Sequence, residues 1–600
     1  MTRRRGGGRT RGLVAMIAVA GLTLGACGGG DSADSPAEEP SEEPATEDTT
    51  AATEAPAEEP SEEPATEDTL VEETIAPEEN LDPVFGGTLR YAIEAEVDGL
   101  NPTQNNISAP GYVILNAVFD PLFTYNSEGV AVPFLAESGE PSEDFKDWTV
   151  TLREGVTFHD GTPLNADALL ANFASLRASA LPSLAINPFF PAINADGTDP
   201  GIEKVDDLTV IFHLLDPQAY FPAYLTGQLG MVASPTWLAA SAEDPTLNQA
   251  PVGTGPFAFE SRSEDSVTRV VRNDDWWYGD VYLDAVEFLP VTDVDLRVEL
   301  ITSGEIDALH TTHFPAIETL EEEGFKQVID ETGEESFGMI NVAAPPFDDI
   351  RARQALALAA PIEEYQLLIN EGLGTRANGR FIPSSPYYNA AVTQVGDDIA
   401  AAQPLVAEYC AERGGETNPL LATTTCTDGK INMELQWPGP SVVANRIADI
   451  LEAAWSEAGF NVTRQEIPQD DHIIQVAIGA YNVVTWRQFG APEPAVDNVW
   501  LLCRTIGGIS LNWPRNCDEA RDDTLLAAAA STDPAERASL YQEAEQMIAD
   551  AYTYIFFNHT RWSNAFADNV YGACDSVLPN GDQARCTVNG AGPLSTVWMD

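Results

Sequence analysis

Short segments in which apolar and polar residues alternate recur along the chain from residue 86 onward. In segment 86–94, Leu89 and Tyr91 fall on one face, as they do in a half-buried β-strand. Segments 148–153 and 208–213 repeat the alternation. This pattern predicts β-strands in the N-terminal half of the chain.

Helical periodicity is clearest in the C-terminal half. Asp533 can cap a helix that has Pro534 at its first position and Glu536 at its third. Ser441 can cap a second helix, whose apolar residues recur three and four apart until Gly459. The pattern predicts two helices, one beginning after each capping residue.

The helix that begins after Ser441 lies between two strand-like segments, 432–437 and 460–467. A strand, a helix and a second strand in succession are typical of an α/β layer with parallel strands. We therefore expect the α/β class for the folded part of the chain.

Charge excludes some classes of partner. The 600 residues include 95 Asp and Glu but only 30 Lys and Arg, which gives a formal net charge of −65. Nucleic acids are bound through basic side chains that displace counterions, and anionic membranes attract basic segments. The composition therefore argues against both partners, while an apolar fraction of 44% is enough for a large core.

The N-terminus predicts export and a lipid anchor. Five Arg are followed by the apolar run 13–25, which is shorter than a bilayer-spanning helix and is typical of a secretory signal peptide. The sequence Leu-Gly-Ala-Cys at 24–27 looks like a bacterial lipobox. We expect a signal peptide over 1–26 and lipidation of Cys27, which would hold the protein on the outer face of the cytoplasmic membrane. An ordinary signal peptide with an incidental cysteine is the alternative.

Residues 27–84 are interpreted as an acidic linker. Segment 28–80 contains 19 acidic residues and no Lys or Arg, and the sequence of 36–49 recurs unchanged at 56–69. Such a composition cannot bury enough apolar surface to offset the entropy of ordering. We expect an extended, disordered spacer.

The six remaining cysteines indicate disulfides. Six thiols allow 15 pairings, but they form three close pairs along the chain, and loops of about 15 residues each give about 3 kcal/mol. Disulfides fit an exported protein, whereas the zinc alternative lacks any Cys-x-x-Cys spacing. Sequential pairing is favoured for Cys410 and Cys426, Cys503 and Cys517, and Cys574 and Cys586.

Six blocks in order resemble the extracellular solute-binding proteins of ABC importers, family 5, the class with dipeptide-, oligopeptide- and nickel-binding members. The most diagnostic block is WTVTLREGVTFHDGTPLNAD at 148–167. The other blocks are 86–91 with 100–102, 253–257 with 272–277, 303–307, 346–355, and 533–537 with Tyr541.

This resemblance implies a two-lobed periplasmic-binding-protein-like fold of class II, with a ligand cleft between the lobes. It also implies an extra strand-rich domain. We expect lobe I from 85–125, 230–335 and 555–600, the extra domain at 126–229 packed on lobe I, and lobe II from 336–554.

The resemblance places a ligand-facing segment at Trp486, Arg487, Gln488 and Phe489. In peptide-binding relatives a Trp is followed shortly by an Asp that pairs with the peptide amine, and this chain lacks that Asp. Arg487 would suit a carboxylate or another anion. Its alternative role is an ion pair at the surface or between the lobes, and Glu493 could replace the missing acid.

Other candidates are weaker. Asn105 and Tyr112 lie in a segment that faces the cleft in relatives, and Trp437 belongs to a set of lobe II tryptophans that could stack on a ligand but are more often core residues. His310 and His313 raise the question of a metal site, but two His alone do not make one. We therefore expect no metal and no cofactor.

The function that the resemblance implies is binding rather than catalysis. We expect a monomeric receptor that captures a small solute, a short peptide first, and delivers it to an ABC permease and its ATPase. The alternatives are an oligosaccharide, a nickel complex or another organic solute as ligand, or a role in signalling. A surface-tethered hydrolase finds no support, because the chain has neither a Gly-x-Ser-x-Gly nor a His-Glu-x-x-His motif.

Overall fold

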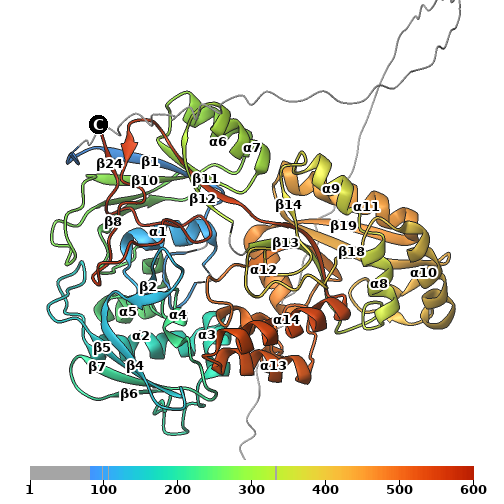
Figure 1. Ribbon diagram of the computed structural model, residues 1–600, viewed down its shortest axis with the longest axis horizontal. Coiled ribbons are helices and arrows are strands. Elements are labelled where there is room, and N and C mark those ends of the chain that lie inside the picture. Colours follow the sequence, from blue (N-terminus) through green and yellow to red (C-terminus); the bar gives the residue numbers. More distant parts are fainter. Residues whose placement is uncertain (1–81, 98, 106, 332–333) are drawn as a thin grey trace, which may run out of the picture. The chain divides into compact units, whose positions relative to one another are not determined.

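The computed structural model describes residues 82–97, 99–105, 107–331 and 334–600 (Figure 1). The predicted signal peptide, the lipidation site Cys27 and nearly all of the predicted linker lie outside the described residues. The first strand in the described part of the chain begins at Thr88.

The first of two large sheets contains the predicted strand near Leu89, and it is mixed. Strand β1 runs parallel to both of its neighbours, and the outer strands pair antiparallel. The strand order is β12 (Lys326–Asp330), β22 (Trp562–Phe566), β11 (Ala308–Thr311), β1 (Thr88–Ile93), β10 (Ala285–Pro290), β9 (Val267–Arg272) and β8 (Phe257–Ser263). The helices of this region are α1 (Ala109–Val118), α5 (Pro235–Glu243), α6 (Val294–Thr302) and α7 (Phe314–Glu322).

The second large sheet contains the predicted strand–helix–strand unit, which is confirmed. Strands β18 (Lys430–Gly439) and β19 (Phe460–Pro468) are parallel and joined by α11 (Val442–Ala458). Ser441 accepts a hydrogen bond from the Ala444 amide, and Gly459 ends the helix at a φ of 108°, which glycine adopts without a steric cost. The other strands are β14 (Thr375–Arg376), β21 (Tyr554–His559), β13 (Glu334–Ile340), β20 (Val483–Phe489) and β17 (Cys426–Thr427).

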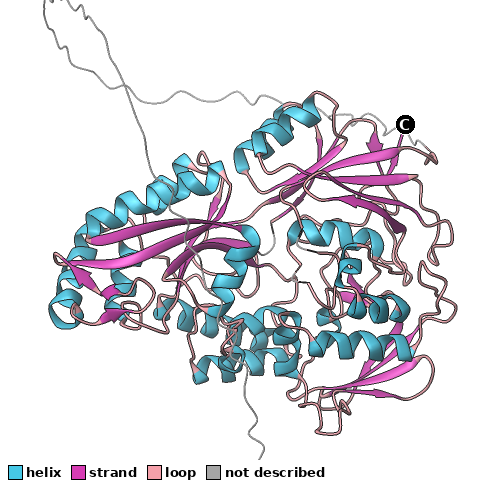
Figure 2. Ribbon diagram, turned by 180° about the vertical axis from the view of Figure 1, so that it is seen from behind, coloured by secondary structure: helices cyan, strands magenta, loops and turns pink. Residues whose placement is uncertain are grey.

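Helices cover the faces of both large sheets (Figure 2). The helix predicted after Asp533 is α14, and Asp533 accepts from the amides of Ala535 and Glu536. It packs against α13. The helices of the second sheet's region are α8 (Ile350–Leu358), α9 (Ile362–Leu368), α10 (Ile399–Arg413), α12 (Gln469–Ile478), α13 (Glu519–Ala530) and α14 (Pro534–Ala551).

A smaller antiparallel sheet occupies the predicted extra domain. Its strands, in order, are β4 (Ala136–Pro141), β5 (Asp147–Leu152), β7 (Thr209–His213) and β6 (Ile202–Lys204), so the two other predicted strands are confirmed. Helices α2 (Ala166–Ala178), α3 (Pro182–Ile186), η1 (Asn187–Phe189) and α4 (Phe221–Tyr224) belong to the same region. Of the helices described, none is by itself long and apolar enough to cross a membrane, although the bent pair 166–178 and 182–189 together has the required length and composition.

The core of the extra domain extends beyond lobe I. Its buried residues Phe190 and Phe212 belong to a cluster that continues into Val484, Trp513 and Tyr541 of the predicted lobe II. The expectation that 126–229 packs on lobe I is therefore incomplete, because this region also shares a core with the second large sheet and its helices.

The chain passes between the two large sheets twice. One passage lies between β12 and β13, and the other joins β21 to β22 through Thr560 and Arg561. The expected lobe boundaries at 336 and 555 fall inside β13 and β21. Both strands pair with each other within the second sheet, so a boundary between the sheets lies outside these strands. Hinges in proteins are formed by a few loop or element-terminal residues, and both passages are connections of this kind.

The remaining short elements are β2 (Phe123–Tyr125), β3 (Ala131–Pro133), β15 (Thr417–Asn418), β16 (Thr423–Thr424), β23 (Val570–Tyr571), β24 (Trp598–Met599), η2 (Pro245–Gln249), η3 (Val496–Trp500) and η4 (Cys503–Thr505).

Candidate functional site

A cavity of about 490 Å³ lies where the extra domain, the loops of the second sheet and the C-terminal segment meet. We call it the inter-lobe cavity. Its lining comes from α1 and the loop after it, from α3, η1 and α4, from residues 488–513 and from 576–595. Segments far apart in the sequence therefore contribute to one space, and its volume is typical of a small-molecule site.

Aromatic side chains dominate the walls of this cavity. Trp500 and Trp513 are stacked with their ring centroids 5.3 Å apart. The Tyr224 hydroxyl donates to the Ala495 carbonyl at 2.6 Å, which ties the extra domain to the loop that carries Trp500. The aromatic lining residues are Tyr112, Phe119, Tyr125, Phe134, Phe189, Phe190, Phe221, Tyr224, Trp276, Phe489, Trp500 and Trp513. Such walls suit an apolar or aromatic ligand body.

Gln488 is a lining residue held in a fixed orientation. Its side-chain oxygen accepts hydrogen bonds from two indoles, Trp486 Nε1 at 3.0 Å and Trp513 Nε1 at 2.6 Å. These two bonds fix the orientation of the amide, whose nitrogen is a hydrogen-bond donor. Trp486 itself does not line the cavity; it supports Gln488 and packs against His472 and Trp513.

Phe489 follows Gln488 and ends β20. Its backbone has a φ of 71°, a region that bulky residues adopt only at a cost. The ring packs against Phe337 and Tyr554, with centroids 5.7 Å from each, and is 6% exposed. Phe489 therefore adds an apolar edge to the cavity and no charge.

Asp497 supplies a carboxylate eight residues later. It lies in η3, is 8% exposed and lines the cavity. Its Oδ2 accepts from the Ala491 amide at 3.3 Å. Burial raises the pKa of Asp497 to about 7, although Arg380 and the amides of Ala491 and Gly490 act in the opposite direction.

Arg487 does not line the cavity, and its contacts agree with the alternative role of an ion pair. Its guanidinium lies 2.6 Å from a Glu94 oxygen and 2.9 Å from a Glu334 oxygen. It also donates to the Thr312 hydroxyl at 2.9 Å and lies over the Trp562 ring. The side chain points toward the region where the chain passes between the sheets, and its charge is already neutralised there.

The two carboxylates that meet Arg487 have opposite pKa shifts. Burial alone would raise the pKa of Glu94, but Arg487, with His310 and Arg297, outweighs it and lowers the pKa to about 2. Burial raises the pKa of Glu334 to about 7 despite Arg487, and the neighbouring charge of Glu94 adds to this rise. One arginine therefore holds one carboxylate fully charged and leaves the other titrating near neutrality.

Of the other expected ligand residues, one lines the cavity and two do not. Tyr112 lines the cavity, and burial raises the pKa of its hydroxyl to about 12. Asn105 does not line it and instead accepts from the Asn101 amide, stabilising a turn. Trp437 is a core residue at 3% exposure, whose indole donates to Asn445 at 2.7 Å. Asn105 and Trp437 are thus structural, because their polar atoms are used within the protein.

Sequence reasoning missed several lining residues. Asp120 follows α1, and its Oδ2 accepts from Trp277 at 2.8 Å, from Trp276 at 3.2 Å and from Thr254 at 3.1 Å. Burial raises the pKa of Asp120 to about 6 in spite of these donors. Neither Asp120 nor Asp497 belongs to a motif, so nothing in the sequence distinguishes them from the many other acidic residues.

His310 and His313 take structural positions. His310 is fully buried in β11, and its Nε2 accepts from the Glu94 amide at 3.0 Å; burial lowers its pKa to about 4. His313 precedes α7. Over the described ranges, no group of three or more His, Cys, Asp or Glu residues is arranged to hold a metal ion.

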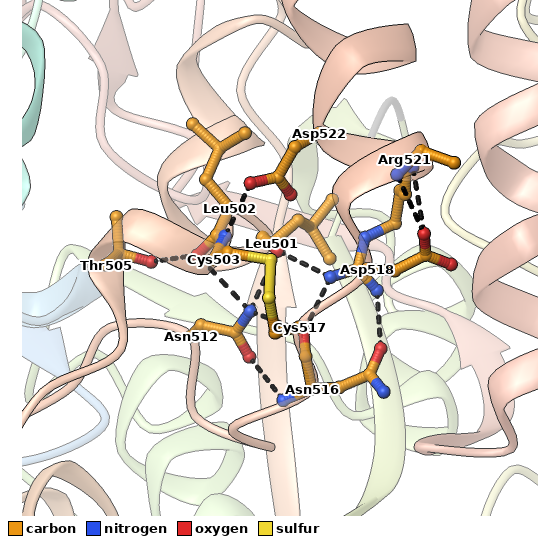
Figure 3. The surroundings of a disulfide bond; sticks show 11 residues. Leu501, Leu502, Cys503, Thr505, Asn512, Asn516, Cys517, Asp518, Arg521 and Asp522 are labelled. Atoms are coloured by element: carbon orange, nitrogen blue, oxygen red, sulfur yellow. Dashed lines mark hydrogen bonds between the residues drawn. A yellow bond between two sulfur atoms is a disulfide. The ribbon is translucent and has the colours of Figure 1, made fainter.

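The wall that carries Trp513 is fixed by a disulfide between Cys503 and Cys517 (Figure 3). Asn512 donates to the Leu501 carbonyl at 2.8 Å, and Arg521 donates to the same carbonyl at 2.6 Å. The two other disulfides join Cys410 to Cys426 and Cys574 to Cys586. The structure therefore contains the sequential pairing, and it places one bridge directly behind the aromatic wall.

The model of the family "Bacterial extracellular solute-binding proteins, family 5 Middle" matches residues 130–508. This chain belongs to that family.

Among the relatives of this solute-binding protein is "Di/tripeptide-binding protein 2" of Pseudomonas aeruginosa. It is 25% identical over 522 residues, which are 83% of this chain and 94% of the relative. The nickel-binding periplasmic protein of Escherichia coli is 24% identical over 406 residues, 66% of this chain and 74% of the relative.

A solved structure with the same fold is the ABC transporter-associated periplasmic binding protein of Helicobacter pylori, in complex with the peptide STSA. It superposes with a TM-score of 0.72 at 20% identity and covers 86% of this chain and 98% of its own. The fold of this solute-binding protein is therefore the two-lobed periplasmic-binding-protein fold.

Replacing Arg487 with alanine should lower the free energy of unfolding by about 3 kcal/mol, because Glu94 and Glu334 would both lose the guanidinium that pairs with them. Denaturant unfolding at neutral pH measures this loss. The matched control is Arg446→Ala, an exposed arginine of α11 whose loss should change stability by no more than about 0.5 kcal/mol. Equal stability of the two variants would contradict the role assigned to Arg487.

The raised pKa of Glu334 makes folding pH-dependent in a defined window. As the pH rises from about 4.5 to about 7, the unfolded state loses this proton and the folded state keeps it, so the free energy of unfolding falls. Glu94, with a lowered pKa, contributes only below this window. In Glu334→Gln the decline should be smaller, as measured by denaturant titrations at several pH values. Parallel curves for the two proteins would argue against the assignment.

Replacing Cys503 and Cys517 together with serine should cost about 3 kcal/mol of stability and loosen the wall around Trp513. Hydrogen exchange of the amides between residues 501 and 513 should then be faster. The control is the double serine variant of Cys410 and Cys426, which line no part of the cavity. It should lose stability without faster exchange at 501–513, and the same acceleration in both variants would refute a local effect.

Proposed function

We propose that this protein is the exported receptor of an ABC importer, which captures a short peptide in the inter-lobe cavity and delivers it to the membrane permease. The observation that carries the proposal is the cavity itself. Its walls come from both lobes and from the extra domain, and two crossings connect the large sheets. A ligand held there would be released by opening of the hinge.

Support for a peptide comes from the relatives and from the cavity. Several relatives are named as dipeptide- or di/tripeptide-binding proteins. Aromatic and apolar walls suit side chains, and Gln488 offers a donor for a peptide carbonyl. A nickel complex is less well supported, because the described residues contain no cluster of metal ligands.

The lobes have a proposed composition. Lobe I contains 85–125, 230–335 and 555–600, lobe II contains 336–554, and 126–229 forms the extra domain. The first large sheet lies in the proposed lobe I. The second lies in lobe II except for the start of β13 and most of β21, which the boundaries at 336 and 555 leave in lobe I.

The cellular arrangement follows from the N-terminus. We propose that Cys27 carries the lipid that anchors the protein outside the cytoplasmic membrane, and that the acidic linker gives the receptor reach to the permease. The protein acts by binding and not by catalysis, as a monomer.

Native mass spectrometry of gently purified protein should detect a bound mass that resolves into amino-acid residues. Isothermal titration with a panel of di- and tripeptides should then give saturable binding at one site. A panel of oligosaccharides serves as the control and should give no heat of binding. A bound sugar or metal complex, with no response to any peptide, would overturn the peptide proposal.

A further inference from the structure

One part of the inter-lobe cavity is lined by apolar side chains from two distant regions of the chain. It lies between α3 and η1 of the extra domain and the segment 499–511, and we call it the apolar pocket. Its lining residues are Ala185, Ile186, Phe189, Val499, Trp500 and Leu511. All of them belong to one hydrophobic cluster, so the pocket lies inside a core that the extra domain shares with this segment.

The two walls of the apolar pocket are fastened to each other beside it. The Tyr224 hydroxyl donates to the Ala495 carbonyl at 2.6 Å, and the Tyr224 ring lies 5.7 Å from that of Phe189. Arg504 pairs with Asp216 and lies over the Phe189 ring, 4.9 Å from its centroid. These contacts favour a pocket that is formed before a ligand binds, as most small-molecule sites are.

Hydrogen-bonding groups beside the apolar pocket are engaged within the protein. Besides the bond from Tyr224, the Thr226 hydroxyl donates to the Ala223 carbonyl at 2.8 Å, and the Trp513 indole donates to Gln488 at 2.6 Å. A polar ligand group that entered here would exchange its hydrogen bonds to water for contacts with apolar side chains. That exchange is costly, so the pocket suits an apolar group.

The charged side chains that line the cavity have partners within the protein. Of the described lining residues, three are charged. Asp120 accepts hydrogen bonds from three side chains, and Arg585 lies 3.0 Å from Asp330. Burial raises the pKa of Asp497, and Arg380 acts against this rise. A charged ligand group therefore meets charges that are already compensated, whereas an apolar group gains from each wall that it covers.

We propose that the apolar pocket receives an aromatic or long aliphatic side chain of the ligand, and that this side chain determines the specificity of the receptor. The ligand class is thus a short peptide with at least one large apolar side chain, in preference to peptides whose side chains are small or charged. This inference rests on the proposed function and specifies the ligand of the same cavity.

The physical basis is the burial of apolar surface. A phenylalanine side chain in place of a methyl group should raise affinity at least about tenfold, because more apolar area leaves water. The ring can also pack against the stacked pair Trp500 and Trp513 in the offset or edge-to-face arrangements that aromatic rings favour. A lysine side chain would bring an ammonium group into the same space, where it would lose its hydration.

The test is isothermal titration with five dipeptides that share one backbone: Ala-Ala, Phe-Ala, Ala-Phe, Lys-Ala and Ala-Lys. At least one of the two phenylalanine peptides should bind about tenfold more tightly than Ala-Ala. Neither lysine peptide should bind more tightly than Ala-Ala, because the pocket offers no partner for the ammonium group among the described lining residues.

A variant that fills the pocket locates the effect. Ala185 is half-buried and lines the cavity from α3, so Ala185→Phe should abolish the preference for phenylalanine and leave the affinity for Ala-Ala within about twofold. Trp500→Ala removes part of the wall and should also reduce the preference, which provides a second test should Ala185→Phe fail to fold. The matched control Ala174→Phe changes an exposed position of α2 outside the cavity lining, and all five affinities should be unchanged.

Equal affinities for Ala-Ala and both phenylalanine peptides, or a preference that Ala185→Phe and Trp500→Ala leave unchanged, would overturn the inference while leaving the peptide proposal intact. The titration also includes indole, an apolar aromatic molecule without a peptide bond. If no peptide binds but indole binds the wild type and not Ala185→Phe, the peptide proposal fails and the pocket stands. If neither indole nor any peptide binds, both are overturned.

Discussion

The ion cluster of Arg487, Glu94 and Glu334 joins the two large sheets, and the arrangement of the two lobes depends on this contact. Glu94 follows the central strand of the first sheet, whereas Arg487 and Glu334 belong to adjacent strands of the second. The crossing strands pass beside them, and Trp562, at the start of β22, donates to Glu334 at 2.9 Å and stacks on the guanidinium. One half-buried cation thus joins a residue beside the first sheet to a strand of the second, where the chain passes between the sheets.

The scarcity of basic side chains also determines which charges surround the cavity. In a very acidic chain, basic side chains are scarce, and those near the ligand space are used in the scaffold: Arg487 at the hinge, Arg380 and Arg537 in buried pairs, and Arg585 beside Asp330. Burying an unpaired carboxylate is costly, so acids without such partners are expected at positions where a ligand completes them.

A disulfide and several hydrogen bonds hold the loops of the cavity wall in a fixed conformation. The segment from Asp497 to Trp513 contains little regular structure, yet Cys503 is bonded to Cys517, and Asn512 and Arg521 satisfy its carbonyls. Tyr224 attaches the extra domain to this segment. Rigid walls reduce the entropy that a ligand must offset on binding.

Much of the architecture was predictable because its causes are local. The alternation around Leu89, the caps at Ser441 and Asp533, and the strand–helix–strand unit around α11 each depend on neighbours a few residues away, and all appear in the structure. The family was likewise visible in six ordered blocks. Arg487 was different: its partner Glu94 lies 393 residues away, and only the pairing of β20 with β13 brings Glu334 beside it.

The class of fold and the residues capable of forming helices, strands and disulfides could be predicted from the sequence alone, since these follow from periodicity, capping and spacing along the chain. The family was indicated separately, by the resemblance of six ordered blocks. Only the tertiary structure decided which polar groups are already satisfied. It turned Arg487 and Trp437 inward and left Asp497 and Gln488 facing the cavity. Whether a charge is available to a ligand depends on partners and burial, which are properties of the packed molecule and not of any residue type.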